Sequence, residues 1–285
     1  MSRSWASELA GRDCRLDLRR PCVIGVLNLT PDSFSDGGRF ASVDAAVRSG
    51  MVMLAEGAAI LDLGGESTRP GAQPVALELE LERVIPVVEA LRRQTDAPLS
   101  IDTSKAEVAR QSIAAGANFI NDISGLNFDD EMAAVVAQSG AGLFLMHTRG
   151  RPADMQQDTV YQDLCGEVSA NLRASLERAR VAGVARECLA VDPGIGFGKS
   201  VAGNLQLLQR IAEFHQLGYP LLLGTSRKSF IGKVLGLKEP LERLPGTLAT
   251  VAWAVSQGVQ LHRVHDVRPA REAALMAWSI REQQF

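Results

Sequence analysis

The chain lacks the features that mark several broad classes of protein. It has no basic excess, because 30 lysines and arginines are balanced by 33 aspartates and glutamates, which leaves a net charge of −3. A nucleic-acid partner is therefore not expected. There are only four cysteines, whose spacing fits neither a metal site nor a disulfide framework. We expect them to be reduced thiols in a cytoplasmic protein.

The chain also lacks a segment suited to export or to a membrane. Its first residues include no apolar stretch of the kind found in signal peptides. The longest uncharged stretch, residues 244–261, contains proline, glycine and glutamine. It predicts a buried helix that leads into a strand rather than a membrane span. No repeat, low-complexity tract or linker is visible, so residues 1–285 are expected to form one domain.

Familiar nucleotide-binding and nucleophilic arrangements are missing as well. Residues 194–200 resemble a phosphate-binding loop, but that motif needs a glycine where the chain has Pro193. The same residues fail the dinucleotide-binding pattern, because the third glycine comes one residue early. No Ser-His-Asp or Cys-His arrangement is visible, so a covalent protein nucleophile is not expected.

What the chain does contain is a series of short apolar runs, each of which ends in a polar or ionisable residue. The runs are nearly continuous in valine, isoleucine and leucine, as is typical of parallel strands that are covered on both faces. They span residues 22–28, 59–62, 98–102, 119–121, 142–147, 189–192, 220–226 and 260–265.

The segments between these runs have the periodicity of helices. Apolar residues recur there at three- and four-residue steps. They are Leu77, Leu81, Val84, Ile85, Val88 and Leu91 in one segment and Leu164, Val168, Leu172 and Leu176 in another. Pro86 is expected to kink the first of these helices. The alternation predicts an α/β fold with one parallel sheet, and eight strand–helix units favour a (β/α)₈ TIM barrel over an open doubly wound sheet.

Two long loops follow the first and second predicted strands, over residues 29–40 and 64–75. Both are rich in glycine, serine, proline and aspartate. In a barrel of this kind the chemistry takes place at the carboxyl ends of the strands, where these loops begin. We therefore expect both loops to act as lids over a site.

The motifs at the strand ends resemble the dihydropteroate synthase family, whose members join a pterin to p-aminobenzoate in the folate pathway. The matching segments occur in the family's order, at residues 25–38, 62–71, 100–105, 121–123, 145–147, 192–199, 226–229 and 263–267. The resemblance implies a TIM barrel, usually dimeric, that is a target of sulfonamides. At Ile24 and Thr225 the chain differs from the residues that are common in the family's motifs, and neither position carries a polar group that the function needs.

Two other functions share the pterin pocket and remain alternatives at this point. One is a methyltransferase that uses methyl-tetrahydrofolate, which would not carry the two loop motifs. The other is a catalytically inactive pterin-binding paralogue, which would have no need of intact loop and anion-binding residues.

The resemblance assigns pterin binding to four residues, Asp102, Asn121, Asp192 and Lys228. The chemistry is suitable, because a buried carboxylate can accept two adjacent N–H bonds from a pterin edge, and a lysine can donate to its carbonyl. Without the resemblance, Asp102 and Asp192 could equally be helix N-caps, since each precedes a predicted helix.

The remaining assignments concern the leaving group and the second substrate. For diphosphate the resemblance implies Thr68, Arg69, Arg263 and His265, although Arg263 could instead form an ordinary surface ion pair. Asn28 would help to hold Mg²⁺, which would be bound mainly by substrate oxygens and water. For p-aminobenzoate it implies Phe34, Thr68, Pro70, Gly71 and Ser229. His147 is expected beside the site, and His215 on the surface.

The catalytic residues implied are Asp102, Lys228 and Asn28. We expect a dissociative substitution, in which diphosphate leaves first and nearby carboxylates such as Asp102 stabilise the pterin methylene cation. The closed loops would exclude water until the arylamine attacks.

Overall fold

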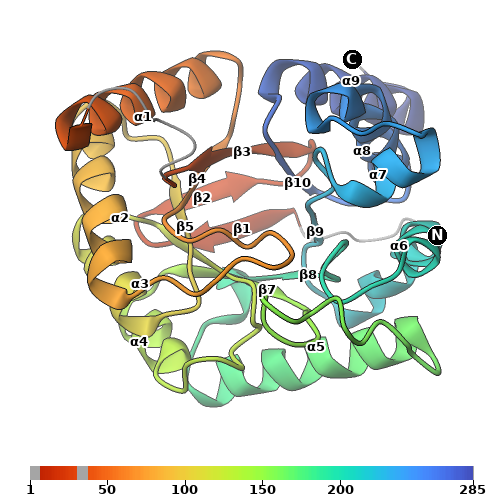
Figure 1. The fold of residues 1–285 in the computed structure, drawn as a ribbon, viewed down its shortest axis with the longest axis horizontal. Coiled ribbons are helices and arrows are strands. Elements are labelled where there is room, and N and C mark those ends of the chain that lie inside the picture. The colour runs from red at the N-terminus through yellow and green to blue at the C-terminus, as the bar shows by residue number, and fades with distance from the viewer. Residues whose placement is uncertain (1–6, 31–37, 285) are drawn as a thin grey trace.

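Eight parallel strands form the centre of the molecule, as Figure 1 shows for the computed structural model, which describes residues 7–30 and 38–284. Their order in the sheet is β8-β7-β6-β5-β4-β3-β10-β9. The strands are β3 (Cys22–Asn28), β4 (Ile60–Gly64), β5 (Leu99–Asp102), β6 (Phe119–Asp122), β7 (Gly142–Met146), β8 (Leu189–Asp192), β9 (Leu222–Leu223) and β10 (Leu261–Val264). Each of the eight predicted apolar runs thus overlaps one of these strands, and β4 and β6 extend slightly beyond theirs.

The two end strands of this sheet meet, so the sheet closes. Val191 forms a parallel bridge with Leu221, and its backbone N–H donates to the Pro220 carbonyl at 3.0 Å. Strand β9 has only two residues although its apolar run covers 220–226. The proline at the start of that run has no N–H to give to a ladder. The predicted barrel is confirmed, and the open doubly wound sheet is excluded.

Helices surround the barrel and cover its outer face. In Figure 1 helices α1 to α5 follow one another around the left and lower sides, and α7, α8 and α9 gather at the upper right. The helices are α1 (Gly38–Ala55), α2 (Leu77–Arg92), α3 (Ala106–Ala114), α4 (Met132–Ser139), α5 (Leu164–Val181), α6 (Val201–Gln209), α7 (Ser229–Leu235), α8 (Leu244–Ser256) and α9 (Val267–Glu282), with short 3₁₀ turns η2 (Arg186–Cys188), η3 (Ile211–Leu217) and η4 (Pro240–Arg243). None of the described helices is both long and apolar enough to cross a membrane.

The periodic apolar residues bury the faces that the sequence predicted. Leu164, Val168, Leu172 and Leu176 of α5 are all buried in the main core. Helix α2 is one continuous element with Pro86 inside it. Residues 244–261 form α8 and lead into β10, as expected for a helix packed against the barrel.

A short hairpin closes the amino end of the barrel. Strands β1 (Glu8–Gly11) and β2 (Cys14–Asp17) pair antiparallel. Leu9 and Leu16 of this hairpin pack into a second core cluster with side chains from the amino-terminal parts of the barrel strands, including the stacked Phe119 and Phe144. This hairpin was not predicted from the sequence. It covers the barrel interior at the amino end, so the interior is open at the opposite, carboxyl end.

The alternation of side chains along the strands divides the barrel interior into two layers. Successive residues of a strand point to opposite sides, so residues two apart share a face. Ile60, Phe119, Ala190 and Leu261 belong to the apolar cluster beside the hairpin. The residues two positions further along the same strands are Asp62, Asn121, Asp192 and Arg263. The interior is therefore apolar at the amino end and polar at the carboxyl end.

Candidate active site

Arg263 is the centre of the polar layer. Its Nε donates to Asp62 Oδ2 at 2.5 Å, and its Nη2 donates to Asp102 Oδ2 at 2.7 Å. Asn121 Nδ2 also donates to Asp62 Oδ2, at 3.3 Å. The side chain of Arg263 is only 21% exposed. The alternative that Arg263 forms a surface ion pair is therefore wrong.

Asp62 belongs to this cluster but was not among the predicted site residues. Its side chain is almost fully buried, at 1% exposure. The sequence did contain a sign of this role, because Asp62 ends an apolar run. It also lies two positions after Ile60 in the same strand, so both side chains point into the barrel. Its role is clear only once Arg263, distant in the sequence, is seen to contact it.

Burial and the neighbouring charges shift the pKa values of the Asp102 and Arg263 side chains. Burial raises the pKa of Asp102 to about 7, although the neighbouring Arg263 opposes that shift. For Arg263 the attraction of Asp62 and Asp102 outweighs the effect of burial and raises its pKa. The Oδ1 atoms of both aspartates are buried without a hydrogen-bond partner. Two carboxylate oxygens are thus available to a ligand that brings N–H donors or positive charge.

Asp192, at the end of β8, is a further polar side chain at the carboxyl end of the barrel. Its Oδ1 accepts a hydrogen bond from Gly194 N at 2.7 Å, and burial raises its pKa. Lys228 attracts that carboxylate electrostatically. The Lys228 ammonium lies 4.5 Å from the centre of the Phe197 ring and donates to the Ile195 carbonyl. Burial lowers the pKa of Lys228 to about 8. Phe197 was not among the predicted site residues, yet it lies directly beside Lys228, a predicted pterin ligand.

The helix-capping alternative for the two aspartates is wrong. At the start of helix α3 the Ala106 N–H donates to Asp129 Oδ2 at 2.8 Å, and Asp102 lies in the strand and binds Arg263 instead. Helix α6 is capped by Ser200, whose hydroxyl accepts from Gly203 N at 3.0 Å. Both aspartates are therefore free of a capping role, at strand ends as a ligand site requires.

His265 follows β10 and is held by the neighbouring strand end. Ser226 Oγ lies 3.1 Å from His265 N and 3.0 Å from its Nδ1. Burial and the nearby charges of Arg263 and Arg227 lower the pKa of His265 to about 4. Arg69 contributes in the same direction. At neutral pH His265 is uncharged, so it would contact an anion by a hydrogen bond, while the arginines carry the positive charge.

The loop between β4 and α2 is closed at its base. Glu66 Oε2 accepts from Lys105 Nζ at 2.5 Å and from Val75 N at 3.1 Å. Lys105 also pairs with the buried Glu80. The two ends of the loop are thereby held together, and between them Gly71 N donates to the Pro152 carbonyl at 2.8 Å. Among those residues, Arg69, Pro70 and Gly71 are exposed and Thr68 is half-buried.

The other predicted residues differ in their burial and in their distance from the polar layer. Ser229 is exposed at the start of α7, next to Lys228. Phe34, and most of the first predicted loop, lie outside the described residues. His147 is buried beside the site, as expected. His215 is half-buried and its Nε2 lies 3.0 Å from the Gln257 carbonyl, away from the polar layer.

Asn28 fits the predicted metal role by its register. It pairs with Gly64, which in turn pairs with Asp102, so the strand between Asn28 and Asp102 presents no side chain at that level. Asn28 is half-buried at the end of β3. Within residues 7–30 and 38–284, no three His, Cys, Asp or Glu side chains lie close enough to hold a metal ion. A neutral amide at this position suits Mg²⁺ whose other ligands are phosphate oxygens and water.

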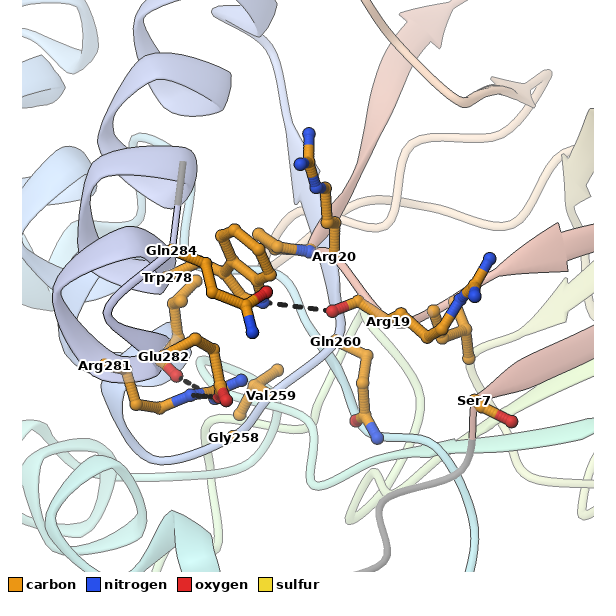
Figure 2. Close-up of a pocket in the computed structure, with 13 residues that line it drawn as sticks. Ser7, Arg19, Arg20, Gly258, Val259, Gln260, Trp278, Arg281, Glu282 and Gln284 are labelled. Carbon is orange, nitrogen blue, oxygen red and sulfur yellow. Dashed lines mark hydrogen bonds and ion pairs between the residues drawn. The ribbon is translucent and has the colours of Figure 1, made fainter.

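A separate cavity of about 320 Å³ lies at the other end of the barrel. Figure 2 shows Arg19, Arg20 and Gln260, which precede barrel strands, lining it together with Trp278 and Arg281 of α9. Trp278 Nε1 donates to the Arg19 carbonyl at 3.0 Å, and the Arg20 guanidinium lies 5.0 Å from the Trp278 ring. None of the predicted site residues lines this cavity.

Comparison with known proteins identifies the family. Residues 24–265 match the model of the pterin binding enzyme family. The chain is 50% identical over 259 residues to dihydropteroate synthase of Synechocystis, which covers 91% of this chain and 90% of that protein. The chain belongs to the dihydropteroate synthase family of pterin-binding enzymes. Members of this family are transferases of folate biosynthesis.

Solved structures of the family superpose closely on this fold. The Yersinia pestis dihydropteroate synthase, solved with a sulfonamide drug, has a TM-score of 0.91 and 45% identity, covering 96% of this chain and 99% of that one. The Xanthomonas albilineans dihydropteroate synthase, solved with 4-aminobenzoic acid, has a TM-score of 0.89 and 44% identity, covering 96% and 98%. The barrel is thus the family's own architecture.

Proposed function

We propose that the protein condenses 6-hydroxymethyl-7,8-dihydropterin diphosphate with p-aminobenzoate to give 7,8-dihydropteroate and diphosphate. The observation that carries this proposal is the ring of buried polar side chains at the carboxyl end of a barrel that belongs to the dihydropteroate synthase family. Asp192 and Asn121 offer the acceptors and donors that a pterin edge needs. Arg263 lies beside them with the positive charge that a diphosphate leaving group needs.

The pterin would bind between Asp192 and Lys228. One oxygen of Asp192 is taken by Gly194 N, so its other oxygen would accept from the pterin amino group or ring N–H. Lys228 would donate to the pterin carbonyl, giving up its contact with the Ile195 carbonyl. Asn121, fixed through its amide nitrogen to Asp62, keeps its side-chain oxygen for the ring.

The reaction we propose is a dissociative substitution. The bond between the pterin methylene carbon and the bridging diphosphate oxygen breaks first, and that electron pair leaves with the diphosphate. The resulting cation lies near Asp102, whose buried carboxylate stabilises it electrostatically. The p-aminobenzoate nitrogen then forms the new C–N bond and releases one proton. Lids built from residues 29–40 and 64–75 would keep water from trapping the cation.

Diphosphate would be held by Arg263, His265, Arg69 and Thr68. Mg²⁺, when bound through Asn28 and phosphate oxygens, would neutralise charge on the leaving group. The p-aminobenzoate ring would lie against Pro70 and Gly71 with Phe34, and its carboxylate would reach Ser229. Sulfonamides would compete for this second position.

We also propose a cytoplasmic homodimer. All four cysteines are free, as expected in a reducing compartment. Exposed apolar side chains gather on α7, η4, α8 and α9 and would suit a subunit interface. They are Val234, Leu235, Leu241, Trp253, Met276 and Ile280. Sedimentation velocity should give twice the mass of one chain, and Trp253→Glu should shift the protein toward the monomer.

One assay separates the proposal from its alternatives. The protein is mixed with the pterin diphosphate, p-aminobenzoate and Mg²⁺, and both diphosphate release and dihydropteroate are measured. Equal amounts of the two products are expected. A methyltransferase would form neither product, and a binding-only paralogue would bind the pterin by calorimetry but release no diphosphate. Omission of p-aminobenzoate should suppress dihydropteroate completely.

A further inference from the structure

Lys199 is a buried lysine that the proposed reaction does not use. Lys199 is only 3% exposed to solvent. Its Nζ lies 2.9 Å from His147 Nδ1 and donates to the Phe197 carbonyl at 2.8 Å, with the His147 carbonyl further away at 3.5 Å. No carboxylate lies within ion-pair distance of this amine among the described residues. A lysine buried without a carboxylate partner is costly, which makes a purely incidental role hard to account for.

The partners of Lys199 belong to two different loops. His147 follows β7, whereas Phe197 lies in the glycine-rich loop of residues 193–198 that follows β8. His147 N also donates to the Asp192 carbonyl at 2.9 Å, which ties the β7 end to the β8 end. Lys199 therefore closes a small ring of contacts that begins and ends at the strand carrying Asp192.

The glycine-rich loop can take its path only because three of its residues are glycines. Gly194, Gly196 and Gly198 have φ angles of 72°, 86° and 62°, in the left-handed region. A side chain at Gly194 would come within 1.8 Å of the His147 carbonyl, and one at Gly196 within 3.0 Å of the Lys228 side chain. The loop is thus packed between the β7 end on one side and Lys228 on the other.

The same loop contacts two of the four predicted pterin ligands, Asp192 and Lys228. Gly194 N donates to Asp192 Oδ1, and the Ile195 carbonyl accepts from Lys228 Nζ. Movement of the loop would therefore change the direction of the Asp192 carboxylate and the position of the Lys228 amine together. Arg263 and His265, two of the four predicted diphosphate ligands, are held by Asp62, Asp102 and Ser226 instead.

We infer that Lys199, through His147 Nδ1 and the Phe197 carbonyl, is a positioning residue for pterin recognition. It holds the glycine-rich loop so that Asp192 and Lys228 face one ligand, and it takes no part in holding diphosphate. This inference rests on the proposed function, because it assumes that a pterin binds to Asp192 and Lys228. It adds a residue that touches neither substrate and yet selects which half of the first substrate is bound tightly.

The test is calorimetry with two separate probes, 6-hydroxymethylpterin and inorganic diphosphate with Mg²⁺. Lys199→Met keeps the buried stem and removes the amine. We expect pterin affinity to fall on the order of tenfold to a hundredfold, since misplacement of a binding group by about 1 Å can cost up to about a hundredfold. Diphosphate affinity should stay within about twofold of the parent protein.

Val251→Ala is the matched control for lost stability. Val251 is a buried residue of α8, at 1% exposure, whose truncation destabilises the core without touching the glycine-rich loop. At a comparable fall in Tm, this variant should bind both probes as the parent does. If Lys199→Met retains full pterin affinity, or loses both probes alike, the inference is overturned.

A second variant keeps the inference testable if Lys199→Met does not fold. His147→Phe retains a ring and removes Nδ1, so it should show the same selective loss of pterin. Unchanged pterin affinity in this variant would also overturn the inference. Failure of the proposed function would look different, because the parent protein would then either not bind 6-hydroxymethylpterin at all or bind it without forming dihydropteroate in the assay above.

Discussion

Arg263 divides its guanidinium between two carboxylates, donating from Nε to Asp62 and from Nη2 to Asp102. A planar group with donors in a fixed fork can satisfy both at once, whereas an ammonium is a point charge. The arrangement keeps a cation and two carboxylates close together inside the barrel. A diphosphate and a developing carbocation would each find the opposite charge there, on neighbouring atoms of one cluster.

Replacing Arg263 by lysine should therefore impair catalysis despite the conserved charge. One ammonium cannot reproduce the contacts to both Asp62 and Asp102, so we expect kcat/KM to fall about a hundredfold. Arg19→Lys is the control, because Arg19 also binds a carboxylate, Asp17, but is exposed at the opposite end of the barrel. Steady-state kinetics of the two variants would contradict this account if both retained parental kcat/KM.

Asp192→Asn should weaken pterin binding while the protein stays folded. The amide can keep its oxygen toward Gly194 N, but it then presents a donor to the donors of the pterin. Loss of a charge-assisted acceptor should cost about 2–4 kcal/mol of binding free energy. Calorimetry with 6-hydroxymethylpterin measures this, with Asp17→Asn as the control. Parental affinity in Asp192→Asn would remove Asp192 from the pterin site.

Much of this site could be predicted from sequence because its residues end apolar strands. Parallel strands of a barrel present their carboxyl ends on one rim, so Asp102, Asn121 and Asp192 had to lie near one another once the barrel was accepted. The motif resemblance then separated a ligand role from helix capping. Contacts between distant residues were less accessible. The interaction of Asp62 with Arg263 spans 201 positions, and no local pattern reveals it.

Two other features escaped the sequence for physical reasons. The β1–β2 hairpin consists of two four-residue strands, too short for a clear alternation, and its place in the barrel depends on Leu9 and Leu16 meeting distant aromatic rings. In the sequence, Lys199 lies in residues 194–200, which match the phosphate-binding loop motif only in part. Its partner His147 is 52 positions away, so only the fold shows that it is buried.

The pH dependence of kcat/KM should be a narrow bell. Asp102 must be ionised to stabilise the cation, and its pKa of about 7 means that this is lost as pH falls through that value. Lys228 must be protonated to donate fully, and its pKa of about 8 means that this is lost as pH rises. Activity measured from about pH 6 to pH 9 should peak between the two values. Lys228→Arg should remove the alkaline limb, and a flat parental profile would contradict both roles.

Asp102→Asn should stabilise the fold, and more so at high pH. The pKa of Asp102 is raised from 3.8 to about 7, so the unfolded state ionises first as pH rises. The cost to the native state is absent at low pH, grows between these two values and is complete above about pH 7. The gain in free energy of unfolding should be larger at about pH 8 than at about pH 5. Equal gains at both pH values would refute this account, and turnover should fall in the same variant.

The two substrates should bind in a fixed order. The loop of residues 65–76 is held at its base by Glu66, Lys105 and Val75, and beyond the base it exposes Arg69, Pro70 and Gly71. The p-aminobenzoate position would be built from those exposed residues, and fixing each backbone residue costs about 1–2 kcal/mol. Diphosphate drawn to Arg69, Arg263 and His265 would offset part of that cost before the second substrate arrives.

We therefore expect p-aminobenzoate to bind tightly only when diphosphate and Mg²⁺ are present, and sulfonamides to show the same dependence. Titration of p-aminobenzoate with and without diphosphate measures the coupling, which by linkage must act equally on diphosphate affinity. Arg69→Ala should reduce the coupling, because it removes the charge that connects the loop to the anion. Arg19→Ala at the far end of the barrel should leave it unchanged. If p-aminobenzoate binds with one affinity in both conditions, its site is already formed in the free protein and the loop does not act as a lid.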